Sequence, residues 1–189
     1  MDLYQIIITY NKAWTTREII CFSMGLCIAI IIGTHLLRLK KIEFSQFIAS
    51  LLALAFLGVV FGTTVFTRNP GTRQYQLEVF WSWKEIFGIG VRGRVGAEMP
   101  EELLKENFLN MLLLLPLGIL LPFIRGKKFA LWKGLTVGII VSAAIELLQL
   151  ILCRGLFEFD DMIHNGIGCM VGCMIGNIFF CCIFSRNHL

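Results

Sequence analysis

The segment from Ser142 to Gly172 holds the residues whose types and spacing could carry chemistry. It places Glu146 inside a long apolar run, where an ionisable side chain costs on the order of 3 kcal/mol in a membrane. Such a residue is rarely kept for stability alone, so its position indicates a function. The polar residues that accompany it are Gln149, Arg154, Glu158, Asp160, Asp161, His164 and Asn165.

The spacing of these residues predicts a hairpin between two helices that gathers them into one pocket. Glu146 and Gln149 are three residues apart and therefore share one face of a helix. After a turn at Arg154, an Asp-Asp pair opens the next helix. His164 and Asn165 each follow one of these aspartates by four positions, so they lie about one turn further along.

A purely structural role is one interpretation of this cluster. Asp160 is a good N-cap, Asp161 suits the positive end of a helix dipole, and Arg154 can neutralise either carboxylate. Glu146 could be protonated and hydrogen-bonded to an amide such as that of Asn110. The sequence leaves this interpretation open beside two functional ones.

In the first functional interpretation, a divalent cation binds the phosphate of a lipid head group. The ligands of the cation would be Glu146, Asp160, Asp161 and His164. No spacing in this set is diagnostic of a metal site. Apart from this optional cation, no metal or other cofactor is predicted.

In the second interpretation, basic side chains bind a phosphate while carboxyl groups transfer protons. The candidate catalytic residues are then Glu146, Asp160 and Asp161. The candidate residues for binding a substrate or anion are Arg68, Arg73, Asn107, Asn110, Gln149, Arg154, His164 and Asn165. The sequence contains no recognisable catalytic triad or nucleophile elbow, so it leaves open whether the protein is an enzyme.

The composition indicates an integral membrane protein. Apolar residues make up 57% of the chain and charged residues 16%, against about 45–50% and 25% in soluble domains. Five apolar runs are long enough to cross a hydrocarbon core that requires about 17–25 helical residues. The expected spans are Ile19–Leu37, Phe44–Phe66, Phe108–Ile124, Leu131–Leu152 and Met162–Phe184. We therefore expect an all-α bundle of five transmembrane helices that forms one domain over residues 1–189.

Basic residues in two short connections predict the orientation of this bundle. They lie at residues 38–41 and 125–133, and such clusters stay on the cytoplasmic side. The N-terminus and the loop of residues 67–107 are then outside, and the C-terminus is inside. Aromatic residues within residues 77–89 predict a short helix or turn at the membrane surface, followed by a flexible glycine-rich connection over residues 88–96. The cytoplasmic loops account for the net charge of +4, so no nucleic-acid site is predicted.

Proline and glycine positions predict how two of the helices pack. The third helix is expected to begin ahead of its membrane span, with Pro100 in its first turn, and to be interrupted by Pro116. Gly168, Gly172 and Gly176 form one stripe on the fifth helix, where another backbone can approach closely. The expected partner of this stripe is the fourth span or a second copy of the chain in a homo-oligomer.

Two motifs resemble those of the VanZ-like family of bacterial membrane proteins. They are ENFLNMLLLLPLGILLP, from Glu106 to Pro122, and IELLQLILCRGLFEFDDMIHNGIGCMVG, from Ile145 to Gly172. Arg68 and Arg73 also resemble the family's outer-loop arginine. The resemblance covers about residues 60–180, and the segment from Tyr75 to Ile89 departs from the pattern of many members.

The resemblance implies a multi-pass protein of the bacterial cell membrane. The family is named after an accessory protein that raises resistance to teicoplanin, and no settled reaction comes with it. The leading hypothesis is therefore a protein that lowers susceptibility to lipophilic glycopeptides at the outer leaflet. Its expected partners are a membrane lipid or a lipid-linked cell-wall precursor, and the glycopeptide itself. The alternatives are an intramembrane enzyme acting on a phospholipid or polyprenyl-phosphate head group, and a component of a lipid or drug transporter.

Overall fold

The computed structural model describes residues 14–89 and 100–185, and helices dominate both parts. Within these two parts, five helical segments are long and apolar enough to cross a membrane, in the order that the sequence predicts. A glycine-rich connection was expected over residues 88–96, and residues 90–96 of it lie outside the described residues. The elements are α2 (Thr16–Arg38), α3 (Phe44–Phe61), the π-helix η1 (Gly62–Phe66), β1 (Gln74–Gln76), α4 (Trp81–Ile86), α5 (Pro100–Leu113), α6 (Leu115–Arg125), α7 (Leu131–Leu152), β2 (Leu156–Glu158) and α8 (Phe159–Ser185).

The third span consists of two helices because proline interrupts it. Pro116 lacks the N–H that would bond to the carbonyl group four residues earlier. The chain accordingly ends α5 at Leu113 and restarts as α6 at Leu115, which confirms the predicted interruption. Pro100 lies in the first turn of α5, as predicted.

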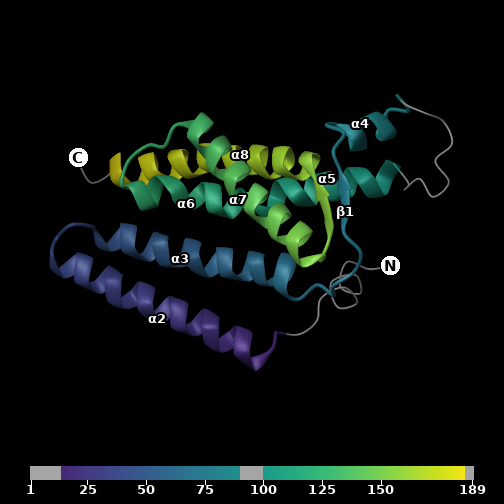
Figure 1. The fold of residues 1–189 in the computed structure, drawn as a ribbon. Coiled ribbons are helices and arrows are strands. Elements are labelled where there is room, and N and C mark those ends of the chain that lie inside the picture. The colour runs from purple at the N-terminus through teal and green to yellow at the C-terminus, as the bar shows by residue number, and fades with distance from the viewer. Residues whose placement is uncertain (1–13, 90–99, 186–189) are drawn as a thin grey trace.

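Helix α8 packs against α5, α6 and α7, on the side of the bundle away from α2 (Figure 1). Helix α3 packs against α6, and α2 packs mainly against α3. An apolar core forms where α3, α6, α7 and α8 meet. Its buried residues are Ala53, Val60, Val65, Leu114, Leu117, Ile145 and Cys169.

The glycine stripe of α8 contacts the third span. A Cβ atom on Gly168, Gly172 or Gly176 would overlap a backbone carbonyl oxygen of the α5–α6 segment. The third span, and not the fourth as one prediction had it, therefore packs against this stripe. The break at Pro116 allows α5 and α6 to approach α8 in succession, so the stripe is already covered within one chain.

This close approach predicts that Gly172→Ala destabilises the fold. The added methyl group would overlap the carbonyl oxygen of Leu115, and overpacking of this kind costs about 1–3 kcal/mol. The matched control is Gly25→Ala on α2, because no atom of the described residues beyond the local helix backbone and the two chain neighbours lies within 4 Å of a Cβ built at Gly25. We expect thermal unfolding in detergent to occur at a clearly lower temperature for Gly172→Ala only. Equal unfolding temperatures would contradict the packing described here.

Two short strands connect the segment after η1 to the hairpin between α7 and α8. Strand β1 pairs in parallel with β2, and Tyr75 lies opposite Phe157. Gly71 strengthens this connection by donating its N–H to the carbonyl oxygen of Cys153. The pairing brings residues far apart in the sequence to one end of the bundle, where the predicted site residues also lie.

Candidate functional site

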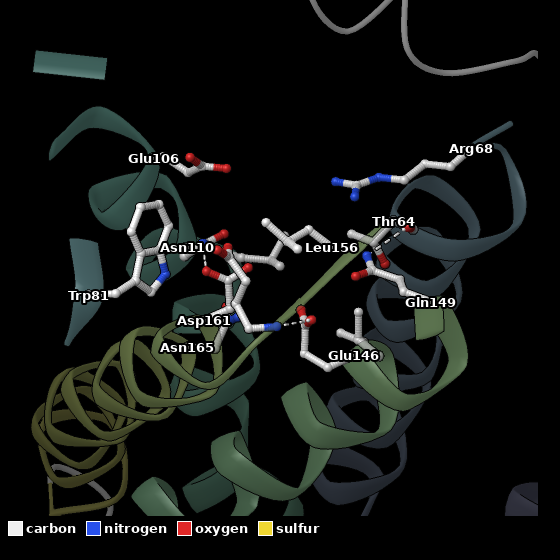
Figure 2. Close-up of a pocket in the computed structure, with 13 residues that line it drawn as sticks. Thr64, Arg68, Trp81, Glu106, Asn110, Glu146, Gln149, Leu156, Asp161 and Asn165 are labelled. Atoms are coloured by element: carbon white, nitrogen blue, oxygen red, sulfur yellow. Dashed lines mark hydrogen bonds between the residues drawn. The ribbon is translucent and has the colours of Figure 1, made fainter. Parts of the chain in front are cut away.

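A cavity of about 140 Å³ lies at the end of the bundle where α7 ends and α8 begins. Four carboxyl side chains line it: Glu106 from α5, Glu146 from α7, Glu158 from β2 and Asp161 from α8. Figure 2 shows Arg68 and Glu106 on opposite sides of one edge of this cavity. We call it the carboxyl cavity.

The turn after α7 positions the carboxyl group of Glu146. Cys153 adopts a left-handed conformation with φ of 54° and ends the helix, and Arg154 donates its N–H to the carbonyl oxygen of Gln149. This turn sends β2 back past the end of α7. The N–H of Glu158 then donates to Oε2 of Glu146 at 3.1 Å, and only 3% of Glu146 is exposed. Glu146 therefore lies buried at the wall of the cavity with one oxygen held by the backbone.

Amide side chains hold the other parts of the cavity wall. Nδ2 of Asn110 donates to Oδ1 of Asp161, which joins α5 to α8. Nδ2 of Asn165 donates to Oγ of Ser142 at 3.0 Å, which joins α8 to α7. Nε2 of Gln149 donates to the carbonyl oxygen of Thr64 at 3.0 Å in the π-helix. Four elements of the bundle are thus fixed to one another around the carboxyl groups.

The environment of Glu158 favours its protonated form. Burial removes the water that would stabilise the carboxylate, and the negative charges of neighbouring acidic residues, foremost Asp161 and Glu106, add to this effect. Together they raise the pKa of Glu158 to about 8. Near neutral pH the cavity wall therefore carries a carboxylic acid that can donate a proton or a hydrogen bond.

Three buried polar atoms of cavity residues have no hydrogen-bond partner among the described residues. They are Nε1 of Trp81, Oε1 of Glu158 and Oδ1 of Asn165. A buried polar atom left without a partner costs about 1–3 kcal/mol. One donor and two potential acceptors around a cavity indicate a site for a polar ligand, since a bound ligand or water would satisfy them.

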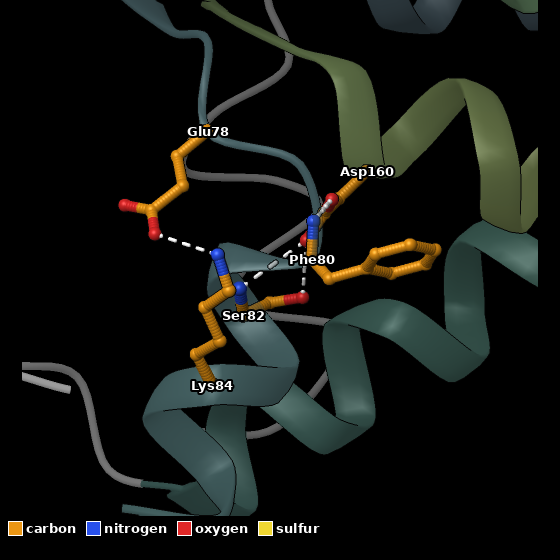
Figure 3. Close-up of polar contacts among 5 residues, drawn as sticks. All are labelled: Glu78, Phe80, Ser82, Lys84 and Asp160. Atoms are coloured by element: carbon orange, nitrogen blue, oxygen red, sulfur yellow. Dashed lines mark hydrogen bonds and ion pairs between the residues drawn. The ribbon is translucent and has the colours of Figure 1, made fainter. Parts of the chain in front are cut away.

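Asp160 lies outside this cavity and holds α4. Its carboxylate accepts hydrogen bonds from the backbone N–H groups of Phe80 and Ser82 and from the Ser82 hydroxyl group (Figure 3). Asp160 is 2% exposed and is not among the residues that line the cavity. The candidate catalytic residue Asp160 therefore lies in different surroundings from those of Asp161.

His164 and Asn107 also contact side chains of α4. Nε1 of Trp83 donates to Nε2 of His164 at 2.8 Å, and Nδ2 of Asn107 donates to Oγ of Ser82 at 3.1 Å. Neither His164 nor Asn107 lines the carboxyl cavity. These contacts position α4 so that its first residue, Trp81, reaches the cavity wall.

This arrangement predicts that Asp160→Asn loosens α4. Both oxygens of Asp160 accept hydrogen bonds, and hydrogen bonds to a charged group contribute about 1.5–3 kcal/mol each. We expect the amide hydrogens of Phe80 and Ser82 to exchange with solvent about tenfold faster or more in the variant.

Lys84→Gln is the control because it breaks the exposed ion pair between Lys84 and Glu78, which is also drawn in Figure 3. Exposed pairs contribute little, so exchange should hardly change. Unchanged exchange in Asp160→Asn would show that Asp160 does not hold α4.

The three arginines that were predicted to bind an anion do not come together at the carboxyl cavity. Arg68 lines it, and its guanidinium group lies close to Gly155. Nη1 of Arg154 instead donates to the carbonyl oxygens of Val65 and Phe66, and Arg73 is exposed and absent from the cavity wall. Four carboxyl groups with one arginine favour a neutral or cationic hydrogen-bonding ligand over an anion.

The predicted set of metal ligands is likewise divided. Glu146 and Asp161 face the cavity, whereas Asp160 and His164 contact α4. Within residues 14–89 and 100–185, no three His, Cys, Asp or Glu side chains are arranged so that they could hold a metal ion. The four-residue site suggested by the sequence is therefore not formed.

Sequence reasoning assigned no role to several residues of the cavity wall, among them Trp81, Glu106 and Glu158. Glu158 could have been found, because it lies in the same polar segment as Glu146. Glu106 begins the first family-like motif. Trp81 carries no such signal, because only the docking of α4 brings it to residues about eighty positions later in the chain.

Comparison with known proteins agrees with the motifs. The family model described as VanZ/LLP1 matches residues 44–180, which include the whole wall of the carboxyl cavity and exclude α2. No match was found among curated proteins or among solved structures. Because the family model matches well over half of the chain, this membrane protein belongs to the VanZ/LLP1 family.

Proposed function

We propose that this protein acts at the outer leaflet of the bacterial cytoplasmic membrane and lowers susceptibility to lipophilic glycopeptides such as teicoplanin. In this proposal, the carboxyl cavity binds the polar head group of a membrane lipid or of a lipid-linked cell-wall precursor. Membership of the VanZ/LLP1 family supports the proposal in general terms. The unpartnered polar atoms of the cavity wall are the observation that carries it.

The distribution of basic residues supports a cavity that faces outside. Exposed lysines and arginines cluster at the connections α2–α3 and α6–α7. These connections lie at the end of the bundle opposite the carboxyl cavity (Figure 1). The positive-inside rule favours a cytoplasmic position for these connections, and this supports a cavity near the outer leaflet.

The chemistry of the wall supports a head group rich in hydroxyl, amide or amino groups. Trp81 offers an indole N–H, Asn165 offers a carbonyl oxygen, and the acidic residues can accept hydrogen bonds or pair with an amine. Lipid-linked wall precursors carry sugars and peptides with such groups. Binding them would change the surroundings in which a lipophilic glycopeptide meets its target.

Susceptibility measurements test this function. A glycopeptide-susceptible Gram-positive host would carry the chain or an empty vector, and inhibitory concentrations of teicoplanin and vancomycin would be compared. We expect the concentration of teicoplanin needed for inhibition to rise several-fold, with a smaller change for vancomycin, which lacks the lipid tail. Equal teicoplanin values with and without the chain would contradict the proposed role.

One observation favours a second function, acid–base chemistry on a lipid head group. Glu158 has a pKa of about 8 and lies beside the buried carboxyl group of Glu146, so the cavity contains a proton donor near neutral pH. This function predicts a chemically altered lipid after incubation with the purified protein. Mass spectrometry would detect the product, and unchanged lipids would exclude this function for the lipids tested.

A further inference from the structure

A second site lies on the other side of η1 from the carboxyl cavity. A cavity of about 480 Å³ is bounded by the N-terminal half of α2, the C-terminal end of α3 and the end of α7. A neighbouring cavity of about 430 Å³ continues along α2 and α3, and both are lined by Cys21, Phe22, Gly58 and Phe61. We call the two together the α2–α3 groove. Each cavity lies within the range of about 300–1,000 Å³ that is typical of ligand sites.

The groove exists because two glycines allow aromatic rings to lie against α3. A Cβ atom on Gly58 would overlap the ring of Phe22, and one on Gly62 would overlap the ring of Trp14. Helix α2 lies on the far side of α3 from the other helices (Figure 1) and exposes many large apolar side chains. The floor and walls of the groove are therefore apolar over its length, which suits a hydrocarbon chain.

The mouth of the groove carries more positive than negative charge. Arg17, Glu18 and Arg154 line it, giving two guanidinium groups against one carboxylate. The Glu18 carboxylate accepts a hydrogen bond from the N–H of Thr15 at 2.8 Å. Neither arginine forms an ion pair with a described residue, and the carbonyl oxygens of Val65 and Phe66 fix the position of Arg154.

We propose that the α2–α3 groove binds an anionic phospholipid such as phosphatidylglycerol. One acyl chain lies between α2 and α3, and the phosphate lies at the mouth between Arg17 and Arg154. Guanidinium groups present paired N–H donors that match phosphate oxygens, and the charge at the mouth complements the single negative charge of the phosphodiester. Helix α2 lies outside the residues matched by the VanZ/LLP1 family model, so the site joins α2 to the matched part of the chain.

Native mass spectrometry of the purified full-length protein tests this site. The protein would be equilibrated with equal amounts of phosphatidylglycerol and phosphatidylcholine that carry the same acyl chains. We expect the protein to retain phosphatidylglycerol at least fivefold more than phosphatidylcholine. Arg17→Gln should reduce this ratio to near one, because Arg17 is exposed and its substitution leaves the packing of α2 unchanged. Arg38→Gln, at the opposite end of the same helix, should keep the ratio of the unmodified protein.

A second variant separates the acyl-chain site from the phosphate site. Cys21→Phe places a large side chain in the groove and should reduce retention of both lipids alike. Equal retention of the two lipids by the unmodified protein, or equal effects of Arg17→Gln and Arg38→Gln, would overturn the proposal. Displacement of phosphatidylglycerol by an equal concentration of a polyprenyl phosphate would also overturn it, because the occupant would then be a different class of lipid.

Discussion

The Glu146→Gln substitution is expected to abolish the proposed protection against teicoplanin. Glutamine has nearly the same shape as glutamate and can still accept the hydrogen bond from the N–H of Glu158. It cannot ionise, and it cannot accept or release a proton at the cavity wall. The fold should therefore persist while the chemistry of the carboxyl cavity is lost.

The matched control is Glu101→Gln, because Glu101 is exposed in the first turn of α5 and does not line the cavity. Inhibitory concentrations would be measured in one host at equal amounts of membrane-inserted protein. Glu146→Gln should behave like the empty vector, whereas Glu101→Gln should behave like the unmodified protein. Full protection by Glu146→Gln would show that the buried acid has only a packing role.

Stability is expected to fall at high pH because of Glu158. Its pKa is about 8 in the folded protein against an ordinary value of 4.5, so folding makes the side chain hold its proton more tightly. The contribution of Glu158 to the free energy of unfolding is therefore fully present below about pH 4.5 and falls as pH rises through 8. Since one pKa unit corresponds to about 1.4 kcal/mol, the loss is on the order of a few kcal/mol.

Thermal unfolding of the purified protein at pH 6 and pH 9 would measure this effect. The unmodified protein should unfold at a clearly lower temperature at pH 9. Glu158→Gln should reduce the difference between the two pH values, because glutamine does not titrate. A difference of the same size in the variant would place the pH sensitivity at another residue.

The long helices could be predicted closely because their physical signal is local. The apolar run of α7 ends where Cys153 turns the chain, and the observed bounds Leu131–Leu152 are those predicted. Pro116 likewise removes one backbone hydrogen bond from its helix whatever the neighbouring helices are, so the interruption could be predicted from the sequence. The strands β1 and β2 were not predicted, because three-residue strands carry no detectable periodicity and depend on a partner far away in the sequence.

Most of the predicted residues that line the cavity share one hairpin, and Arg68 and Asn110 join them from elsewhere in the chain. Glu146, Gln149, Asp161 and Asn165 line the same cavity, as their helical spacing indicates. The sequence could not show that Asp160 points away from Asp161 toward α4. Adjacent residues on a helix project in directions about 100° apart, and only the position of α4 decides which of the two faces the cavity.

For the glycine stripe, too, the sequence indicated the contacting face of the helix but not the helix that covers it. The spacing of Gly168, Gly172 and Gly176 correctly indicated a face for close helix contact. Which helix covers it depends on the break at Pro116, which lets α5 and α6 lie successively against α8. Spacing within one helix carries no information about that arrangement.

The lipids that remain bound after purification from bacterial membranes test the central role of the carboxyl cavity most directly. Native mass spectrometry would compare the unmodified protein with Glu146→Gln, prepared from the same host under the same conditions. The account predicts that the unmodified protein retains a lipid with a polar, hydrogen-bonding head group and that the variant retains at least tenfold less of it. The same lipids in the same amounts on both proteins would contradict the account, because the buried acid would then have no part in binding.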